Sequence, residues 1–329
     1  MSLFSPSSDW KPREILIDYS SSKYIAVDTE TYDPNLKSNG PGGFKKDGFV
    51  VGISLCDEHK RMCYLPIRHQ GGGNLPEELI ISYLKNVLET SKTKVFANAL
   101  YDLEWLSTLG VNTQGSIFDI QVAETLINEN RKSFSLDNIS YDYLREKKDE
   151  TLLEDAVRSM VSARANVKQN LWKLHSSYVG PYAEKDAELT MRVFLMQLPI
   201  LEKEELTKVM KIESRLIPLL LSMRQKGVRV DIEKAAKLRD TLVKKQDQVQ
   251  AELNSIAGQE VNVWANASIA KAYEKENITF LRTAKGSPSF TQDWLESAQD
   301  NLSGLVLKVR KLYKLRSTFI ENMIIAKSV

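Results

Sequence analysis

Two acidic residues stand two positions apart in the run YIAVDTET, residues 24–31. Successive side chains of a β-strand point to opposite faces of the sheet, so Asp28 and Glu30 would emerge side by side. Two neighbouring carboxylates repel each other, and a cation between them relieves the repulsion. Because hard divalent ions such as Mg²⁺ and Mn²⁺ prefer carboxylate oxygen, the pattern predicts a metal-binding strand. The alternative is an exposed strand end that happens to be acidic.

Three further candidates stand in predicted helices. Asp102 follows the point where a short buried strand at 95–97 runs into a helix, and functional groups of α/β sheets gather at such junctions. Tyr182 and Asp186 are four residues apart in the helical pattern of 179–198, so they share one face of that helix. Packing in the core is the alternative role for Tyr182.

The first 200 residues predict an α/β fold with a mixed sheet and helices. A polar, glycine-rich stretch at 35–47 predicts a loop, and the charged, weakly patterned residues 147–170 predict a mobile, helix-rich crossover. The order β-β-β-α-β-α is that of a ribonuclease H-like fold. Strands are expected at 24–31, 49–55, 62–67, 95–97 and 116–118, and helices at 76–88, 98–106, 119–130, 136–146 and 179–198.

The last hundred residues predict a mostly α-helical arm. Long helical patterns cover 233–256 and 302–327, with Asp231 as the N-cap and Gly258 as the stop of the first. Basic residues of the second helix have few acidic neighbours, so they are suited to contact phosphate; a solvated helix face is the alternative. These residues are Lys308, Arg310, Lys311, Lys314 and Arg316.

Length and composition indicate a protein of two or more domains that works in a reducing compartment. The chain has 329 residues, and Cys56 and Cys63 are its only cysteines, which argues against a disulfide framework. Neither a signal peptide nor an apolar stretch of about 20 residues is present, so the expectation is a cytoplasmic protein without a membrane segment. Residues 201–329 are net basic and residues 1–200 net acidic, which suits a metal site joined to a polyanion-binding arm.

Three motifs of the first part resemble those of the DEDDy 3′→5′ proofreading exonucleases. The motifs are D-T-E at 28–30, N-x-x-Y-D at 98–102 and Y-x-x-x-D at 182–186. The resemblance implies two divalent ions, Mg²⁺ or Mn²⁺. Asp28, Glu30 and Asp186 would hold the first ion, and Asp28 and Asp102 the second, with Asp28 bridging.

The same resemblance implies roles for two residues that are not metal ligands. Tyr182 would orient the attacking water through its hydroxyl, because a tyrosine with a pKa near about 10 is a poor base at neutral pH. Asn98 would support the substrate strand or the loop that carries Asp102.

The remaining chain is similar to family A DNA polymerases. Residues 212–231 resemble the segment that leads from the exonuclease into the palm and thumb. Residues 283–289 are similar to the thumb tip, where Ala284 stands in place of the usual proline. The expected domains are therefore a 3′→5′ exonuclease at 1–200, a palm-entry segment at 201–232 and a thumb-like helical arm at 233–329.

The catalytic motifs of the palm and fingers have no match in the sequence. Asp18-Tyr19-Ser20 precedes the exonuclease strand and lacks the Glu that should follow. This chain alone is therefore not expected to polymerise DNA, and the palm and fingers are expected on a separate chain or on the rest of a longer one. The histidines, none of which is followed by Asp-Glu, are His59, His69 and His175.

The resemblance thus implies the exonuclease and thumb portion of a phage polymerase that works in the cytoplasm of a bacterial host. A single-stranded DNA 3′ end would enter the exonuclease site, and primer-template duplex would contact the thumb. Two rival hypotheses remain: a DNA-binding scaffold that retains an inactive exonuclease fold, and a stand-alone exonuclease that acts on RNA.

Overall fold

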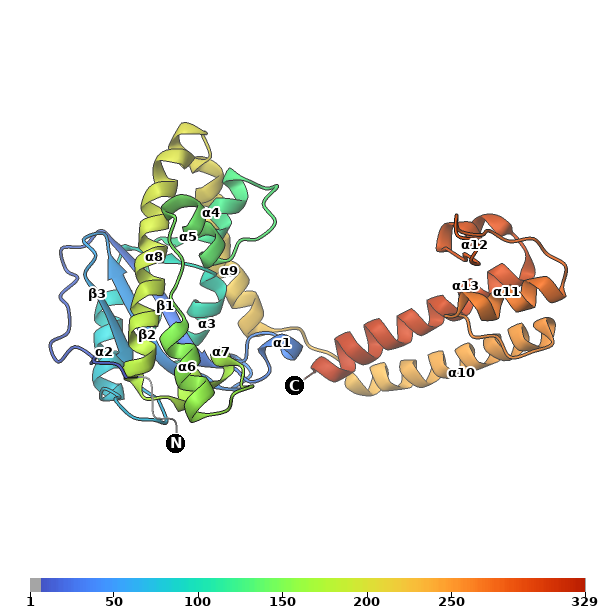
Figure 1. Ribbon diagram of the computed structural model, residues 1–329, viewed down its shortest axis with the longest axis horizontal. Helices are drawn as coiled ribbons and strands as arrows, with labels where there is room; N and C mark the ends of the chain where they lie inside the picture. The colour runs from blue at the N-terminus through green and yellow to red at the C-terminus, as the bar shows by residue number, and fades with distance from the viewer. Residues whose placement is uncertain (1–6, 329) are drawn as a thin grey trace. The chain divides into compact units, whose positions relative to one another are not determined.

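The computed structural model describes residues 7–328 and divides into two compact units between Gly227 and Val228 (Figure 1). In the described part of the chain, no helix is both long enough and apolar enough to cross a membrane. The palm-entry and thumb assignments of the domain scheme stay predictions.

A five-stranded mixed sheet forms the centre of the first unit, in the order β3-β2-β1-β4-β5. The central strand β1 pairs antiparallel with β2 and parallel with β4, as the ribonuclease H-like expectation requires. Each predicted strand is present, with ends shifted by one or two residues. The strands are β1 (Tyr24–Tyr32), β2 (Phe49–Asp57), β3 (Met62–Pro66), β4 (Thr93–Phe96) and β5 (Ile117–Asp119).

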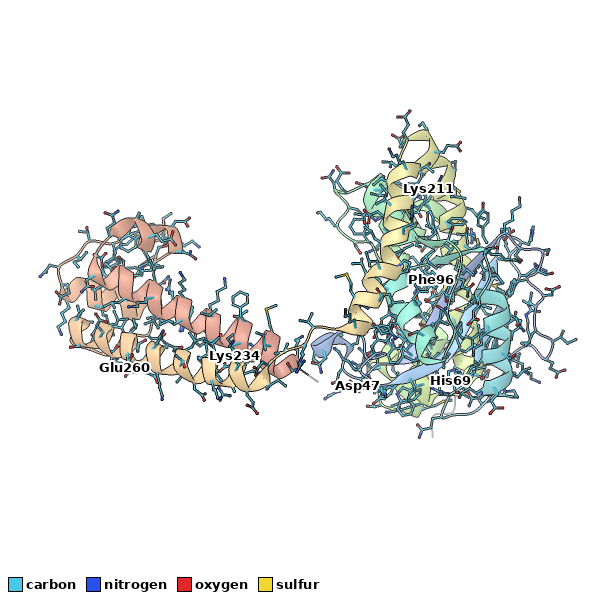
Figure 2. The ribbon with its side chains drawn as sticks, turned by 180° about the vertical axis from the view of Figure 1, so that it is seen from behind. Asp47, His69, Phe96, Lys211, Lys234 and Glu260 are labelled. Atoms are coloured by element: carbon cyan, nitrogen blue, oxygen red, sulfur yellow. The ribbon has the colours of Figure 1, made fainter. Side chains whose placement is uncertain are left out.

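Helices cover both faces of this sheet. Ile25 and Val27 of β1 pack against α2 and α3, whereas Ala26, between them, packs on the opposite face with residues of α4, α5 and α8. Phe96, labelled in Figure 2, is fully buried at the end of β4. The helices are α2 (Glu77–Leu88), α3 (Ala99–Thr108), α4 (Ile120–Ile127), α5 (Leu136–Leu144), α8 (Ser176–Lys203) and α9 (Thr207–Lys226).

Short helices occur in the stretch expected as a loop and in the crossover expected to be helix-rich. The polar stretch expected as a loop contains one helical turn, α1 (Leu36–Asn39), where the Leu36 and Gly40 backbone atoms form a hydrogen bond. The crossover contains α6 (Thr151–Met160), α7 (Val167–Asn170) and a 3₁₀ turn, η1 (Leu171–Lys173). Leu153, Ala156 and Val157 of α6 enter a core cluster, and their i, i+3, i+4 spacing is that of an amphipathic helix.

The second unit is helical, as predicted. Helix α10 (Ile232–Ala257) begins at Asp231, whose carboxylate accepts the Lys234 N–H at 2.9 Å, and ends at Gly258 with φ +58°. Helix α13 (Asn301–Lys314) lies antiparallel beside α10 (Figure 1). The predicted second long helix continues with π-helical and 3₁₀ hydrogen bonding, in η2 (Leu315–Ile324) and η3 (Ile325–Lys327). Two shorter helices, α11 (Asn266–Lys275) and α12 (Gln292–Ala298), complete the unit.

Candidate active site

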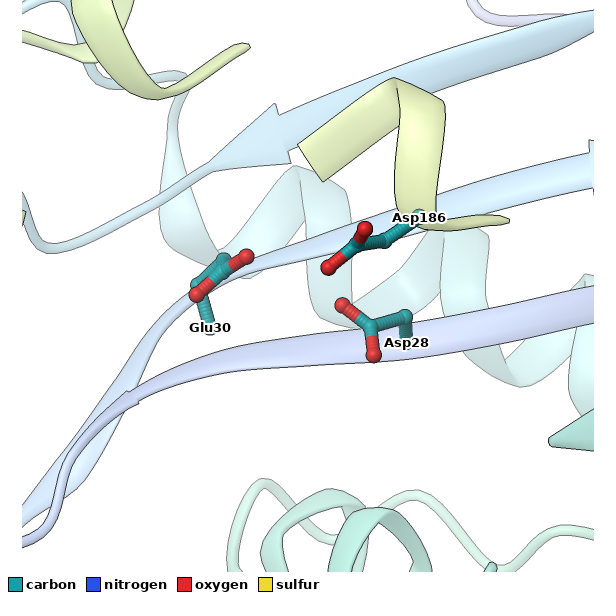
Figure 3. A group of neighbouring side chains, drawn as sticks. All are labelled: Asp28, Glu30 and Asp186. Atoms are coloured by element: carbon teal, nitrogen blue, oxygen red, sulfur yellow. The ribbon is translucent and has the colours of Figure 1, made fainter. Parts of the chain in front are cut away.

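Three carboxylates converge between the central strand and the long helix α8. Asp28 and Glu30 of β1 and Asp186 of α8 each offer one oxygen atom, and these atoms lie within 4.8 Å of one another (Figure 3). The alternation of β1 places both strand residues on the face of Ala26, which is the face that α8 covers. A register shift in the pairing of β1 with β2 follows directly after Glu30. The structure thus brings together the acidic residues that were predicted on the strand and on the helix.

Two of these carboxylates are buried, and Asp28 is half-buried. Glu30 is 7% exposed and Asp186 3% exposed. Burial raises the pKa of Glu30 well above its usual value, and the charges of Asp28 and Asp186 raise it further. Burial likewise raises the pKa of Asp186 to about 7, although a nearby lysine opposes the shift. Carboxylates in such an environment favour either a proton or a cation.

The lysine beside the cluster is Lys148, from the loop between α5 and α6. Its Nζ atom lies 2.7 Å from Oδ2 of Asp186 and 3.4 Å from the hydroxyl of Tyr182. The side chain is only 9% exposed. Sequence reasoning missed this residue, because it lies 38 positions from Asp186 in a charged loop outside the predicted helices.

Tyr182 lies one helical turn before Asp186 and faces the same site. Its ring is 5.1 Å from the ammonium of Lys148, and its side chain is 7% exposed. Burial raises the pKa of Tyr182 well above its usual value, and the charges of Asp186, Glu30 and Asp28 add to this effect. The hydroxyl is therefore protonated and can donate a hydrogen bond.

Asp102 lies beside the group of three carboxylates and is not one of its members. Its Oδ1 accepts the N–H of Thr29 at 3.1 Å and the Thr29 hydroxyl at 2.6 Å. Strand β1 pairs with β4 only from Tyr24 to Ala26, and the Asp102 carboxylate binds β1 beyond that point. Burial raises the pKa of Asp102, and Asp28, the neighbour of Thr29, raises it further.

The start of helix α3 is held by a buried carboxylate that sequence reasoning also missed. Asp119 accepts the N–H groups of Asn98 at 3.3 Å and Ala99 at 2.7 Å, and that of Gln121 at 2.8 Å. It therefore joins the first turns of α3 and α4 and fixes the helix that carries Asp102. Its position directly before a helical pattern was the available signal, because Asp is a favoured N-cap. Asn98 itself has a left-handed backbone, with φ +78°.

A cleft of about 680 Å³ within the first unit opens onto the cluster. Glu30 belongs both to the cluster and to the wall of the cleft. The predicted substrate contact Asn98 lines the cleft, as do Tyr101 and Lys168, whose charge opposes the rise in the pKa of Glu30. The dimensions and the mixed lining suit an extended polar chain.

The five basic residues predicted on the helical arm fall into two groups. Arg310 donates to the carbonyl oxygens of Val263 at 2.8 Å and Phe290 at 3.1 Å, and Arg316 donates to Gln246 and Glu321. These two guanidinium groups thus also hold the second unit together. The lysines Lys308, Lys311 and Lys314 are exposed and line a hollow of about 950 Å³ with Arg310, Trp264 and Tyr313.

The donor set of the cluster fits a hard divalent ion. All three groups are carboxylates, the ligands that Mg²⁺ and Mn²⁺ prefer. In the described part of the chain, Oδ1 of Asp186 is buried and has no hydrogen-bond partner. A buried carboxylate oxygen without a donor is costly, and a metal ion would satisfy it.

Comparisons with known proteins show the family to which the chain belongs. The family model of the 3′–5′ exonuclease domain of family A DNA polymerases matches residues 6–202. A DNA-directed DNA polymerase of Pseudomonas phage M6 is 34% identical over 96% of this chain and 49% of its own length. DNA polymerase I of Borreliella burgdorferi is 24% identical over 94% of this chain and 32% of its own length. The chain thus spans about half the length of its phage relative.

The fold has a counterpart among solved structures. The polymerase domain of Pol1 from M. smegmatis, in a complex with DNA primer-template and dNTP, superposes with a TM-score of 0.64 at 15% identity. The superposition covers 89% of this chain and 45% of that one. The family match, together with the phage and bacterial relatives, confirms the expected polymerase family. Because the family model matches residues 6–202, more than half of the chain, the chain belongs to the 3′–5′ exonuclease domain family of family A DNA polymerases.

Proposed function

We propose that this chain is a metal-dependent 3′→5′ exodeoxyribonuclease that removes nucleotides from the 3′ end of single-stranded DNA. The observation that carries the proposal is the convergence of Asp28, Glu30 and Asp186, with Glu30 also in the wall of a cleft. Membership of the exonuclease family supports the same chemistry. The rival scaffold hypothesis gives no reason to keep three carboxylates within 4.8 Å of one another, two of them buried, since a scaffold could replace them by apolar groups.

The metal ligands are proposed residue by residue. Asp28, Glu30 and Asp186 would hold one divalent ion, and Asp28 together with Asp102 a second. Such ions lower the pKa of bound water and stabilise the charge that develops on a scissile phosphate. The acidic residues contribute the negative charge that holds the ions.

Tyr182 and the cleft would position the reactants. The Tyr182 hydroxyl keeps its proton, so it acts as a hydrogen-bond donor or acceptor that orients a water molecule and not as a base. Asn98 and Lys168 on the cleft wall would contact the last nucleotides of the strand. Lysine is suited to the phosphates of the strand and asparagine to its polar base or sugar groups.

The second unit would bind primer-template duplex. Its exposed Lys308, Lys311 and Lys314 are available to phosphate groups, whereas Arg310 and Arg316 would act partly by holding the unit together. DNA synthesis would require palm and fingers supplied by a separate chain or by the rest of a longer one.

The proposal is tested by digestion of a single-stranded oligonucleotide that carries a label at its 5′ end. Removal from the 3′ end predicts a ladder of labelled products that shorten by one nucleotide at a time in Mg²⁺, and no products in EDTA. A labelled mononucleotide as the first product would show attack from the 5′ end and would contradict the proposal. An RNA strand of the same sequence distinguishes a deoxyribonuclease from a ribonuclease.

Tyr182→Phe is expected to slow nucleotide release by about a hundredfold, because loss of a single hydrogen-bond donor that acts in the transition state costs roughly that much or more. Metal affinity should stay unchanged, since phenylalanine keeps the ring and the four carboxylates remain. Single-turnover digestion and Mn²⁺ titration measure the two quantities. Tyr143→Phe, on α5, is the matched control, and an unimpaired Tyr182→Phe rate would remove the orienting role.

Duplex binding is expected to weaken steeply with salt, and removal of Lys311 and Lys314 should flatten that dependence. Each lost phosphate contact reduces the magnitude of the slope of log K against log[salt] by about 0.9. The slope for the double alanine variant should therefore be smaller in magnitude by about 2. Fluorescence anisotropy at several salt concentrations measures the slope. The double variant of Lys244 and Lys245, exposed on α10, is the control. A slope equal to that of the parent would assign Lys311 and Lys314 to a solvated face.

A further inference from the structure

We propose that Lys148 is a built-in counter-cation of the carboxylate cluster. Its positive charge lowers the affinity of the cluster for a divalent ion. The inference rests on the proposed metal site and adds a residue that determines its affinity. Lys148 lies outside the three motifs that carry the resemblance to the exonuclease family.

The contacts of Lys148 are those of a buried, paired cation. Its Nζ atom lies 2.7 Å from Asp186, 3.4 Å from the Tyr182 hydroxyl and 3.9 Å from Asp137. Because the side chain is 9% exposed, the ammonium has lost most of its hydration. A charge in this position is tolerated only when opposite charge compensates for the lost water. The acidic cluster provides that compensation.

The loop that carries Lys148 is fixed on both sides. Glu146 accepts hydrogen bonds from Lys185 at 3.0 Å and from Arg192 at 2.7 Å, and both donors belong to α8, the helix of Asp186. On the other side, Asp149 accepts the N–H of Thr151 at the start of α6 at 3.0 Å. The ammonium is therefore held at the cluster by its loop as well as by its own ion pair.

The two oxygens of Asp186 serve different partners. Oδ2 receives the ammonium of Lys148, whereas Oδ1 is buried and has no hydrogen-bond partner among the described residues. A divalent ion could therefore share this carboxylate with Lys148. The two cations would repel each other across a few ångströms of poorly hydrated space, where charges interact much more strongly than in bulk water.

Two consequences follow from this arrangement. Lys148 offsets part of the repulsion among Asp28, Glu30 and Asp186 and so stabilises the protein without metal. It also reduces the net negative charge available to a divalent ion and so weakens metal binding. Removal of the ammonium should therefore tighten metal binding and lower the melting temperature in EDTA.

The test compares the whole parent chain with Lys148→Met, which keeps an unbranched side chain without charge. The adjacent Lys147→Met is the matched control, because Lys147 is exposed and contacts the ring of Tyr141. Mn²⁺ binding is measured from the electron paramagnetic resonance signal of free Mn²⁺, and melting is measured in EDTA. We expect Lys148→Met to bind Mn²⁺ at least about tenfold more tightly and to melt at a lower temperature than the parent, since loss of a nearby like charge favours the ion. Lys147→Met should match the parent in both.

Unchanged or weaker Mn²⁺ binding by Lys148→Met would overturn the inference while leaving the metal site intact. If neither protein binds Mn²⁺, the proposed metal site fails and the inference fails with it. Should Lys148→Met not fold, Glu146→Gln replaces it, because this change frees the loop from α8 without altering the cluster. Glu146→Gln should shift Mn²⁺ affinity in the same direction by a smaller factor, and unchanged affinity in that variant would count against the inference.

Discussion

Asp28→Asn is expected to lower the rate of nucleotide release from a DNA 3′ end by at least about a thousandfold, because metal-ion stabilisation of the transition state is worth several kcal/mol and each 1.36 kcal/mol is a factor of ten. Asparagine has nearly the shape of aspartate and lacks its charge. Asp28 is the residue proposed to bridge both ions, so its loss should remove more of the metal site than any other single change.

The fold of the variant should survive, because the change removes one of three mutually repelling charges. Circular dichroism and thermal melting check this point. Asp142→Asn is the matched control: this side chain is 55% exposed and pairs with Arg131. A rate for Asp28→Asn within about tenfold of the parent would exclude the cluster as the catalytic centre.

Glu30→Gln is expected to raise the melting temperature of the metal-free protein at pH 8 by a few degrees, since 1 kcal/mol corresponds to about 2–4 °C for a domain of this size. Glu30 is buried, and no hydrogen bond or ion pair to its carboxylate is formed in the described part of the chain. At pH 8 its ionised form is opposed by burial and by Asp28 and Asp186. Glutamine has the same size and carries no charge, so the variant should gain stability and lose metal binding.

The pH dependence gives an independent check of the same electrostatics. A carboxyl whose folded pKa is raised binds more protons in the folded protein than in the unfolded chain, so stability falls as pH rises between the two values. For Asp186 this window extends from an unfolded pKa of about 3.9 to the folded value of about 7. The parent in EDTA should therefore lose stability between about pH 4 and pH 7, and Mg²⁺ should restore it.

Glu58 is the control of opposite sign, at the other end of β1. The N–H groups of Lys23 and Tyr24 hold the pKa of this carboxyl below its usual value, despite partial burial. Its charge therefore stabilises the fold above the unfolded pKa, and Glu58→Gln should lower the melting temperature at pH 8. If Glu30→Gln melted no higher than the parent in EDTA, the negative charge of the cluster would not destabilise the metal-free fold.

Local patterns were sufficient to predict most of the fold and the acidic residues. The two-residue period of β1 placed Asp28 and Glu30 on one face of the strand. The four-residue spacing in α8 placed Tyr182 and Asp186 on one face of the helix. Both periods are properties of a single element and can be read without knowledge of its neighbours. The convergence of these elements then follows from the order of strands and helices in the chain.

The residues that sequence reasoning missed act across long separations. Lys148 reaches Asp186 from a loop whose path depends on ion pairs of Glu146 with α8. Asp119 serves α4 as an N-cap, but its bonds to the start of α3 cross 20 residues. Similarly, charge pattern alone could not show that Arg310 donates to backbone carbonyl groups. Such contacts exist only after the chain has folded.

The most direct test of the metal-dependent exonuclease is an anomalous difference map from crystals soaked with Mn²⁺ and a short single-stranded DNA with a phosphorothioate at its 3′ end. The proposal predicts a Mn²⁺ peak bound by Asp28, Glu30 and Asp186, with the last phosphodiester of the DNA next to it and the strand in the cleft lined by Asn98. A cluster that binds no Mn²⁺ in the presence of DNA, or a 3′ end bound elsewhere, would contradict it.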